Sequence, residues 1–333
     1  MRLACFSAIK IKCGSENFNG YPVCATLERH IPMSGTKDPA GMGVPPTYVR
    51  RTPLTVLAGG LRLTAVFDGL LKSAFDAYRH VGAAQLRQAL GPMANEDAPW
   101  TDSNCFVVES AGSLGLIDAG SGVHLDHTAG ALSNHLTDMG IAPGDIDYVI
   151  MTHLHGDHVG GLINPDGSRI FPRAVMHLHT EEAEYWRNAP SGVAGEHHPA
   201  DLTGMALRAY SDGAATFEDG REILPGVKAI HLPGHTPGHS GFFIGEGPDA
   251  VFIWGDVIHL PEVQFARPDI TTVYDLDVVR AEESRRKALT MACEARLKVA
   301  GMHLRQPPFG RVVRHRNAFA FTADEIGAAP RVP

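Results

Sequence analysis

The sequence predicts a mixed α+β fold in which strands come first, helices are interspersed, and strands return later in the chain. Short β-rich runs that end at turn residues occur before residue 121 and again between residues 174 and 256. Stretches with helical spacing of apolar residues lie between these runs and after them. The 333 residues, 44% of them hydrophobic, are enough to bury a full core, so one main domain with a leader is expected.

The elements can be placed in order along the chain. Residues 1–58 are rich in Pro and Gly and are expected to form an irregular N-terminal arm, with residues 59–333 as the main domain. A helix is expected over 124–140, where apolar residues recur at helical spacing and a glycine suits the stop. A longer helix is expected from Asp277, as its N-cap, through residue 297. The expected strands are 61–69, 104–110, 114–120, 146–152, 174–179, 227–232, 241–245 and 250–256.

Charge and composition exclude some classes of partner. The net charge of -8 and the pI of about 6.1 lack the basic excess that nucleic-acid binding requires, so no nucleic-acid partner is expected. The five cysteines form no C-x-x-C pair, and their odd number argues against a complete disulfide framework. No apolar run reaches the roughly 18 residues that span a bilayer, so no membrane partner is expected. The expected location is cytoplasmic, with a periplasmic or secreted location left open.

One segment carries the main functional signal. THLHGDHVGG, residues 152–161, places His153, His155, Asp157 and His158 directly after an apolar strand. Alternate residues of an extended segment share a face, so His153 and His155 can address one ion while Asp157 and His158, on the following turn, address another. Imidazole nitrogen and carboxylate oxygen suit Zn²⁺ and similar ions, and so crowded a group would be costly without a cation. A solvated polar loop is the less favoured alternative.

Three later segments repeat one pattern, in which an apolar strand ends at a single residue that can bind metal. They are KAIHLPGHTPGHSG with His235, AVFIWGD with Asp256, and KVAGMHL with His303. Taken alone, a buried histidine or an aspartate after glycine has an ordinary structural explanation. In combination with the first segment, the three residues indicate a metal centre.

This combination resembles a known family. H-x-H-x-D-H, then G-H-T-P-G-H-S, then G-D and a late histidine after a strand are similar to the metallo-β-lactamase superfamily over roughly residues 60–322. Within it, the segments THLHGDHVGGL, HTPGHS, GDVIHLPEVQF with ARPDITTVYDLD following, and HLRQPPFGRV look most like the methyl parathion hydrolase and lactonase-like group. The resemblance implies an αββα sandwich, with two mixed β-sheets face to face and helices on the outer faces.

The resemblance also implies how metal ligands are shared between two divalent ions. His153, His155 and His235 would hold the first ion, Asp157, His158 and His303 the second, and the carboxylate of Asp256 would bridge both. Zinc is the expected metal, with manganese, iron and cobalt as alternatives.

The expected chemistry is hydrolysis. Two such ions about 3.5–4 Å apart lower the pKa of a shared water, so a metal-bridging hydroxide is the expected nucleophile. Asp157 and Asp256 are the expected catalytic residues, and Asp157 could also orient the hydroxide or pass its proton to the leaving group. Asp118, in GLIDAG, is expected to orient a ligand histidine. The alternative is that Asp118 is an ordinary turn carboxylate at the end of a strand. His239 is expected to be a hydrogen-bond donor in the layer of residues around the metal ligands. A purely structural role is equally open.

The expected substrate is a small uncharged lactone, aryl ester or phosphotriester. Trp186 and Phe265 resemble aromatic pocket positions of the methyl parathion hydrolase group, and ordinary core packing is the alternative for both. His259 stands near the expected pocket, where that group tends to have an aliphatic residue. This departure favours a more polar substrate, such as a lactone, over a phosphotriester.

Several other activities are disfavoured. Class B β-lactamases of this fold lack the bridging carboxylate expected at Asp256, and oxygen-reducing flavodiiron proteins usually have Glu at the position of His155. A glyoxalase II-like thioesterase would add a basic C-terminal glutathione site, which is not recognised here. The alternative from another class is a non-catalytic metal-binding or ligand-sensing protein of the same fold, disfavoured because all seven ligand positions are filled. A homodimer, with the N-terminal arm exchanged, is left open.

Overall fold

The computed structural model describes residues 17–18, 21–22, 51–91, 98–125, 127–188 and 202–325. Backbone contacts separate two units, Met1–Lys37 and Asp38–Pro333. In the first unit the described residues form two short antiparallel strands, β1 (Asn17–Phe18) and β2 (Tyr21–Pro22). Most of the predicted arm lies outside the described residues. The second unit contains the candidate site.

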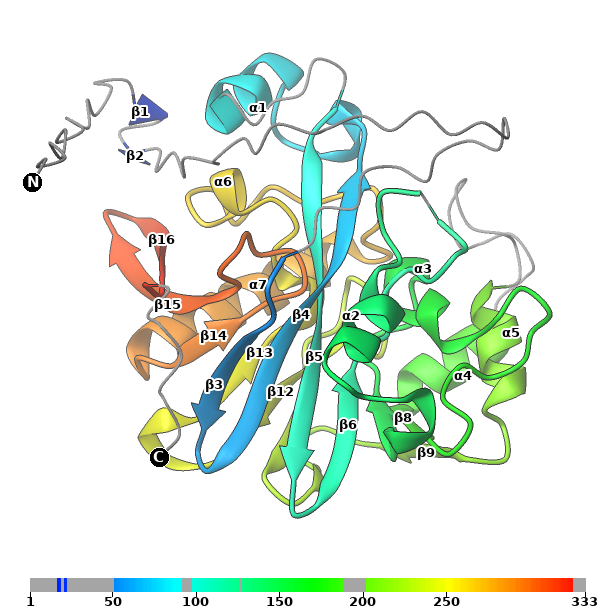
Figure 1. The fold of residues 1–333 in the computed structure, drawn as a ribbon. Coiled ribbons are helices and arrows are strands. Elements are labelled where there is room, and N and C mark those ends of the chain that lie inside the picture. The colour runs from blue at the N-terminus through cyan, green and yellow to red at the C-terminus, as the bar shows by residue number, and fades with distance from the viewer. Residues whose placement is uncertain are drawn as a thin grey trace, which may run out of the picture. The chain divides into compact units, whose positions relative to one another are not determined.

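The first sheet of the larger unit has seven strands in chain order (Figure 1). They are β3 (Leu54–Ala58), β4 (Leu61–Lys72), β5 (Trp100–Ser110), β6 (Ser113–Ile117), β7 (Tyr148–Ile150), β8 (Val175–His179) and β9 (Ala214–Phe217). The pairs from β3 to β6 are antiparallel and those from β6 to β9 are parallel, so the sheet is mixed. All residues of β7 are buried, which is typical of a parallel strand covered on both faces.

The second sheet also has seven strands in chain order. They are β10 (Glu222–Leu224), β11 (Val227–His231), β12 (Ser240–Ile244), β13 (Val251–Ile253), β14 (Lys298–Ala300), β15 (Phe309–His315) and β16 (Ala318–Ala323). The pair β13–β14 is parallel, whereas the other neighbours are antiparallel. A parallel pair needs a long crossover, and here α6 (Pro261–Gln264) and α7 (Val278–Glu294) lie within it.

Alternation of side chains along the strands builds the layers. In β5, Phe106 and Val108 belong to the core between the two sheets, together with Phe242 of the second sheet. Cys105 and Val107 of the same strand belong to the core beneath the helices. The larger unit is therefore an αββα sandwich, as the resemblance implied.

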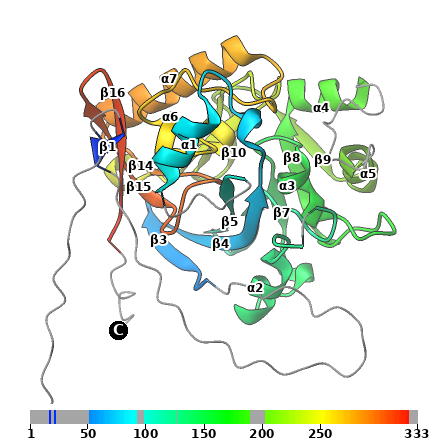
Figure 2. The ribbon, with the colours of Figure 1, turned by 90° about the horizontal axis from the view of Figure 1, so that it is seen from above.

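Helices cover the outer faces of both sheets (Figure 2). α2 (Leu132–Asp138), α4 (Thr180–Asn188) and α5 (Leu202–Ala209) contribute to the core of the first sheet, and α7 contributes to that of the second. The other helices and 3₁₀ turns within the described residues are α1 (Ala83–Leu90), α3 (Gly156–Val159), η1 (Phe75–Ala77), η3 (Pro143–Asp145), η4 (Gly160–Leu162), η5 (Gly247–Asp249) and η6 (Gly255–Val257). Within the described residues, no helix is long and apolar enough to cross a membrane.

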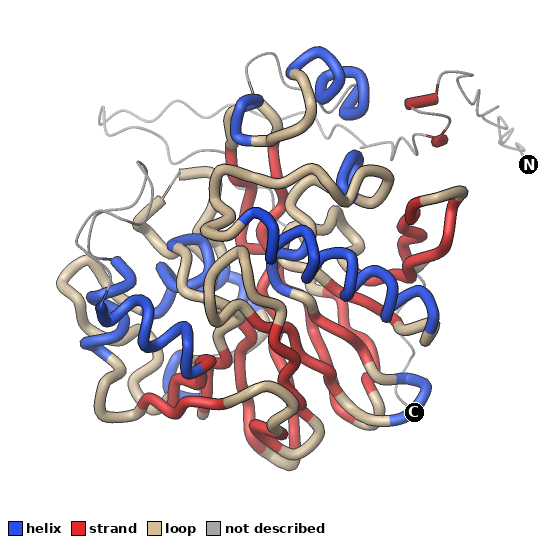
Figure 3. Tube along the Cα trace, turned by 180° about the vertical axis from the view of Figure 1, so that it is seen from behind, coloured by secondary structure: helices blue, strands red, loops and turns tan. Residues whose placement is uncertain are grey.

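The long helix α7 begins where the sequence predicts. Seen from behind, it lies across the strands of the second sheet (Figure 3). The Asp277 side chain accepts hydrogen bonds from the backbone N–H groups of Val279 and Arg280, an N-cap whose loss costs about 1 kcal/mol. Ala288 and Leu289 lie on the face of α7 that packs against the core and are fully buried, which explains the helical spacing of apolar residues.

The regular structure begins earlier than predicted. Residues 54–58, assigned to the irregular arm from their sequence, form β3 and pair with Leu61–Ala65 of β4. The short turn at Gly59 and Gly60 joins the two strands, and both glycines have positive φ angles. The boundary predicted at residue 59 therefore falls inside a hairpin.

The helix predicted over 124–140 is also shorter, because helix α2 begins only at Leu132. Gly130 has a φ of 92°, which an α-helix does not allow. The buried carboxylate of Asp68 accepts hydrogen bonds from the N–H groups of Ser121, Gly130 and Leu132, and so holds the preceding segment as a loop. This long-range anchor overrides the helical pattern of the sequence.

Candidate metal centre

Four of the seven predicted ligands come from the segment after β7. His155 is the N-cap residue of α3, and Asp157 and His158 lie within that short helix. Because the backbone changes from extended to helical at His155, the side chains before and after this point face different partners. The following Gly161 packs closely against another loop, where an added Cβ would lie 1.9 Å from the carbonyl oxygen of Ala119.

The other three ligands come from loops of the second sheet. His235 lies between β11 and β12, Asp256 lies in η6 directly after β13, and His303 follows β14. Gly255 has a φ of 60°, and a Cβ there would lie 2.5 Å from Nε2 of His239. A glycine is thus required for the backbone to place Asp256 at this point.

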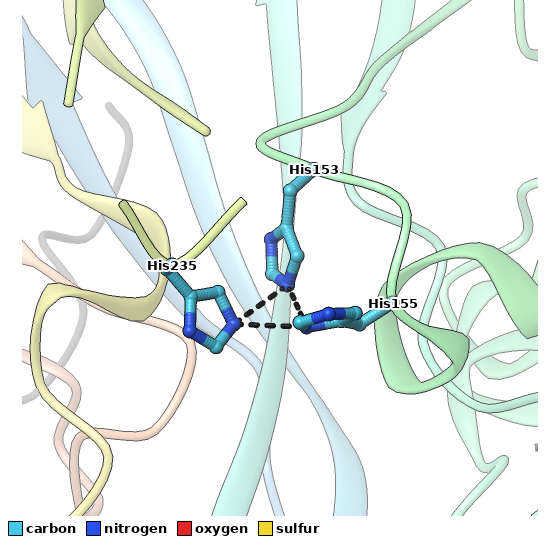
Figure 4. A group of neighbouring side chains, drawn as sticks. All are labelled: His153, His155 and His235. Carbon is cyan, nitrogen blue, oxygen red and sulfur yellow. Dashed lines mark hydrogen bonds between the residues drawn. The ribbon is translucent and has the colours of Figure 1, made fainter. Parts of the chain in front are cut away.

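The first ligand group consists of three histidines whose ring nitrogens face one another (Figure 4). Nδ1 of His155 lies 3.0 Å from Nε2 of His153 and 2.9 Å from Nε2 of His235, and the two Nε2 atoms are 3.2 Å apart. Three nitrogens bound tetrahedrally to one zinc lie about 3.3 Å apart. The spacing therefore suits a shared cation.

The second ligand group consists of Asp157, His158, Asp256 and His303. Nε2 of His158 lies 3.2 Å from Oδ1 of Asp256 and 3.4 Å from Oδ2 of Asp157. Nε2 of His303 lies 3.1 Å from Oδ2 of Asp256 and 3.6 Å from Oδ2 of Asp157. Two imidazoles and two carboxylates thus converge from both sheets.

Asp256 connects the two groups. Its Oδ2 atom lies 3.3 Å from Nε2 of His235 and 3.7 Å from Nε2 of His153, which belong to the first group. Its Oδ1 faces His158 of the second group. The structure therefore brings together all seven side chains selected from the sequence.

Each of four ligand histidines is oriented by a contact at Nδ1. His158 donates to Asp118 (2.6 Å), His235 donates to Asp275 (2.9 Å), and His303 donates to the carbonyl oxygen of Asp102 (2.8 Å). Nδ1 of His153 lies 3.0 Å from the Thr152 hydroxyl, which itself donates to Asp118. These contacts leave Nε2 of all four rings for a cation, as expected of partners that surround metal ligands.

The pKa values of these groups reflect close packing of opposite charges. Burial lowers the pKa of His158, but the carboxylates of Asp256, Asp157 and Asp118 raise it well above its usual value overall. Burial also lowers the pKa of His235, whereas Asp256 and Asp275 raise it, to about 9 in total. The nearby carboxylates therefore favour a positive charge on these imidazoles, and a bound cation would supply that charge instead. Metal binding requires neutral imidazole, so a cation would displace the extra protons.

The donor atoms fit a pair of divalent cations. Among the described residues, Nε2 of His158 and Oδ1 of Asp256 are two of the buried polar atoms that make no hydrogen bond of good geometry, although they lie 3.2 Å apart. A buried unsatisfied polar atom costs about 1–3 kcal/mol, and a cation between these two atoms would remove that cost. Nitrogen and oxygen donors suit zinc, manganese, iron and cobalt alike.

His239 differs from the donor that the sequence suggested. Its Nδ1 donates to the carbonyl oxygen of Leu232 (2.8 Å), and its Nε2 accepts a hydrogen bond from the backbone N–H of Asp256 (2.9 Å). Burial lowers the pKa of His239 to about 3, so the ring stays neutral and can accept. It thereby fixes the backbone of Asp256, the residue shared by the two groups.

The three predicted pocket residues have different surroundings. The Trp186 ring lies beside His155, with centroids 5.9 Å apart, and its Nε1 donates to Glu182. His259 lies 3.2 Å from Oδ2 of Asp256 and stacks on His303. Phe265 is instead a core residue that stacks on Phe321, so core packing, its alternative, describes it better than a pocket wall.

Sequence reasoning missed two buried carboxylates near the ligands. Asp275 holds His235, and Glu182 contacts the backbone next to the three histidines of the first group. Asp275 lies in ARPDITTVYDLD, a segment that resembles the family, and Glu182 lies in EEAEYWR beside Trp186, but no local pattern marks either carboxylate as a partner of the ligands. A further group, His179, Glu181 and His231, also has atoms close enough for one ion, but the two imidazoles stack with planes only 14° apart, so their lone pairs do not converge.

Similar proteins point to the same fold. Among curated proteins, an N-acyl homoserine lactonase from a Bacillus species is 33% identical over 111 residues, which cover 33% of this chain and 38% of the lactonase. An atrochrysone carboxyl ACP thioesterase from Aspergillus fumigatus is 28% identical over 156 residues, 47% of this chain and 30% of the thioesterase. The aligned part thus spans less than half of either relative.

Solved structures match over a larger share of the chain. AidC, a dizinc quorum-quenching lactonase in complex with a product, has a TM-score of 0.77 at 22% identity, covering 83% of this chain and 98% of AidC. AbOPH, a hydrolase in the beta lactamase superfamily, has a TM-score of 0.76 at 26% identity, with the same coverage. The family model of the metallo-beta-lactamase superfamily matches residues 98–294, which hold six of the seven side chains above. This chain belongs to the metallo-beta-lactamase superfamily.

Proposed function

We propose that this chain is a dinuclear metal-dependent hydrolase. The observation that carries the proposal is the sharing of Asp256 by two ligand groups, with Oδ2 3.3 Å from His235 and 3.1 Å from His303. A pair of divalent ions, when bound, lowers the pKa of a shared water and polarises the carbonyl or phosphoryl oxygen under attack. We expect zinc, with manganese, iron or cobalt as alternatives.

Of the two carboxylates, Asp157 is the better placed to meet a substrate. Its side chain is 18% exposed, whereas that of Asp256 is 3% exposed. We assign to Asp157 the orientation of the attacking water and the transfer of its proton to the leaving group, a general acid–base role worth about 10²–10⁴ in rate. Asp256, in contrast, holds the ligand groups together from inside the protein.

The substrate class that we propose is a lactone or an uncharged ester. The names of the curated relatives describe a lactonase and a thioesterase, and both activities break an acyl bond. His259 adds a polar imidazole beside Asp256, and Trp186 adds an aromatic edge beside His155. A polar group in the wall suits a lactone better than a phosphotriester, which carries apolar alkyl groups.

An inactive metal-binding or ligand-sensing protein is the alternative from another class. Loss of one or more ligands would be expected in such a protein, since selection no longer maintains the metal pair. All seven positions here carry a histidine or aspartate, and they lie in two compact groups. This completeness favours an enzyme.

Metal content and hydrolysis test the proposal together. Purified chain should bind two zinc ions by elemental analysis and hydrolyse an acyl-homoserine lactone faster than a p-nitrophenyl ester, an acyl thioester or methyl parathion. Asp256→Asn should lose at least one ion and about 10³-fold in turnover, whereas Asp249→Asn, at an exposed position of η5, should match the wild type. Two bound ions without hydrolysis of any of the four substrates would favour the inactive alternative.

We also propose a homodimer and a cytoplasmic location. Light scattering coupled to size-exclusion chromatography on the full chain and on a chain without residues 1–50 tests the first point, and a monomer in both cases would refute the dimer. Cell fractionation tests the second.

A further inference from the structure

We infer that Glu182 is a positioning residue for the first ligand group, because its carboxylate joins the two loops that carry the three histidines. This inference rests on the proposed function, since it concerns how tightly the first ion is held. Glu182 lies in the first turn of α4 and is only 1% exposed. It is not itself a member of either ligand group.

One carboxylate oxygen fixes the loop of His153 and His155. Oε1 of Glu182 accepts a hydrogen bond of 2.9 Å from the backbone N–H of Leu154, which lies between the two histidines. The carbonyl oxygen of Leu154 in turn accepts from the hydroxyl of Thr203 in α5 (2.8 Å). The backbone on both sides of Leu154 is therefore anchored to helices that cover the first sheet.

The other carboxylate oxygen fixes the loop of His235. Oε2 of Glu182 accepts from the Thr236 hydroxyl (2.6 Å) and from the backbone N–H of Gly238 (3.0 Å). A Cβ on Gly238 would lie 2.3 Å from the backbone nitrogen of Glu182, so the loop approaches α4 as closely as a glycine permits. One side chain thus holds a loop from each sheet.

The contacts require an ionised carboxylate. Besides the three donors named above, Nε1 of Trp186 donates to Oε1 (2.6 Å). Burial raises the pKa of Glu182 above its usual value overall, and the hydrogen bonds from Thr236 and Leu154 oppose this shift because they favour the ionised form. Each oxygen faces two donors, and a glutamine has only one oxygen. The NH₂ group of a glutamine would face two hydrogen-bond donors and could not accept from them. Glutamine could therefore keep the hydrogen bonds to one loop but not to both.

The separation of the two loops determines the geometry of the ligand group. Nε2 of His235 lies 2.9 Å from Nδ1 of His155 and 3.2 Å from Nε2 of His153, and these atoms come from different sheets. Groups that orient metal ligands typically contribute 10–100-fold to metal affinity. We therefore expect Glu182 to set the affinity for one ion of the pair and to leave the other almost unchanged.

Competition with a chromophoric chelator tests this inference, because it resolves two zinc affinities. In Glu182→Gln, one affinity should fall by about 10–100-fold while the other stays within about threefold of the wild type. Glu184→Gln is the matched control, since Glu184 is an exposed residue of the same helix. Thr236→Val removes one donor with little change in shape and should weaken the same ion by a smaller factor. Circular dichroism and thermal unfolding of the metal-free variants measure folding independently of metal.

The possible outcomes separate this inference from the proposed function. Wild-type protein that binds two ions, together with unchanged affinities in Glu182→Gln, would overturn the inference alone. Equal weakening of both ions would also overturn it. If Glu182→Gln does not fold, the zinc affinities of Thr236→Val test the inference instead. Unchanged affinities in Thr236→Val would then overturn the inference. Wild-type protein that binds no pair of ions would overturn both proposals.

Discussion

The carboxylate of Asp118 lies 2.6 Å from Nδ1 of His158 and also accepts the hydroxyl hydrogen of Thr152. That hydroxyl group faces Nδ1 of His153 at 3.0 Å. Asp118 itself has a φ of 57°, a left-handed conformation that aspartate tolerates better than most residues. One buried carboxylate thus orients a histidine in each ligand group, directly in one case and through a hydroxyl in the other.

Asp118→Asn should weaken the ion of the second group by about 10–100-fold. The amide offers one oxygen, so its NH₂ group must face either the backbone N–H of Thr152 or Nδ1 of His158. In the second case His158 would carry its proton on Nε2, where the cation should bind. Zinc affinities measured by chelator competition check this, with Asp249→Asn as the control. Wild-type affinity for both ions would contradict the assigned role of Asp118.

Asp275→Asn should affect the other ion. Oδ1 of Asp275 accepts from Nδ1 of His235, and Oδ2 accepts from the backbone N–H of Thr272 (2.7 Å). Asparagine cannot satisfy both donors, so we expect a 10–100-fold loss of affinity for the ion of the first group. The pair of variants is informative because Asp275 contacts a histidine of the first group alone, whereas Asp118 contacts His158 of the second group directly and His153 only through Thr152. Asp275→Asn should therefore spare the second ion, which Asp118→Asn weakens most. Identical effects of the two substitutions would argue against separate ligand groups.

The sequence predicts the ligands much better than the residues that position them. Six ligands lie within motifs, and His303 ends an apolar strand, so each has a local signature. The roles of Glu182 and Asp275 have no such signature, because the loops and histidine that they hold are distant in sequence. The contact of Glu182 with Thr236, for example, joins residues 54 positions apart. Only the folded chain shows that such carboxylates are buried and shared.

The fold class was confirmed, but the prediction of individual elements failed in places for a similar reason. The sequence pattern correctly predicted α7, whose N-cap bonds are local, and most strands of the first sheet. In the second sheet it predicted β11 to β14 but missed β10, β15 and β16, and in the first it missed β9. It overextended α2, because Asp68 binds the preceding loop from a neighbouring strand. It also missed β3, whose strand character depends on pairing with β4. Local propensity is decisive where the stabilising contacts are local as well.

Asp157→Asn should reduce turnover more than metal binding. The amide oxygen can still bind a cation, so we expect two ions at saturating zinc, although the second binds more weakly. The amide cannot accept a proton, and turnover at saturating zinc should therefore fall by about 10²–10⁴-fold. Lactone hydrolysis is measured with rising zinc until the rate is constant. Turnover equal to that of the wild type at that point would refute the proton-transfer role.

His259→Leu should change substrate preference without loss of an ion. His259 is 6% exposed, lies 3.2 Å from Asp256 and stacks on His303, with ring planes 18° apart. Leucine removes the polar group and leaves an apolar wall. We expect kcat/KM for the lactone to fall about tenfold, the effect of one hydrogen bond to a charged or polar group, and the ratio of phosphotriester to lactone hydrolysis to rise.

A second substitution at this position separates polarity from metal binding. His259→Asn keeps a polar group near Asp256 and should shift the substrate ratio less than leucine does. His259 also lies close enough to His235 and Asp256 to share a cation with them. If it were a ligand, His259→Leu would bind fewer than two ions, and elemental analysis would show the loss. If His259 is a pocket residue, His259→Leu should still bind two ions and should show an altered substrate ratio. An unaltered ratio would show that His259 does not contribute to substrate specificity.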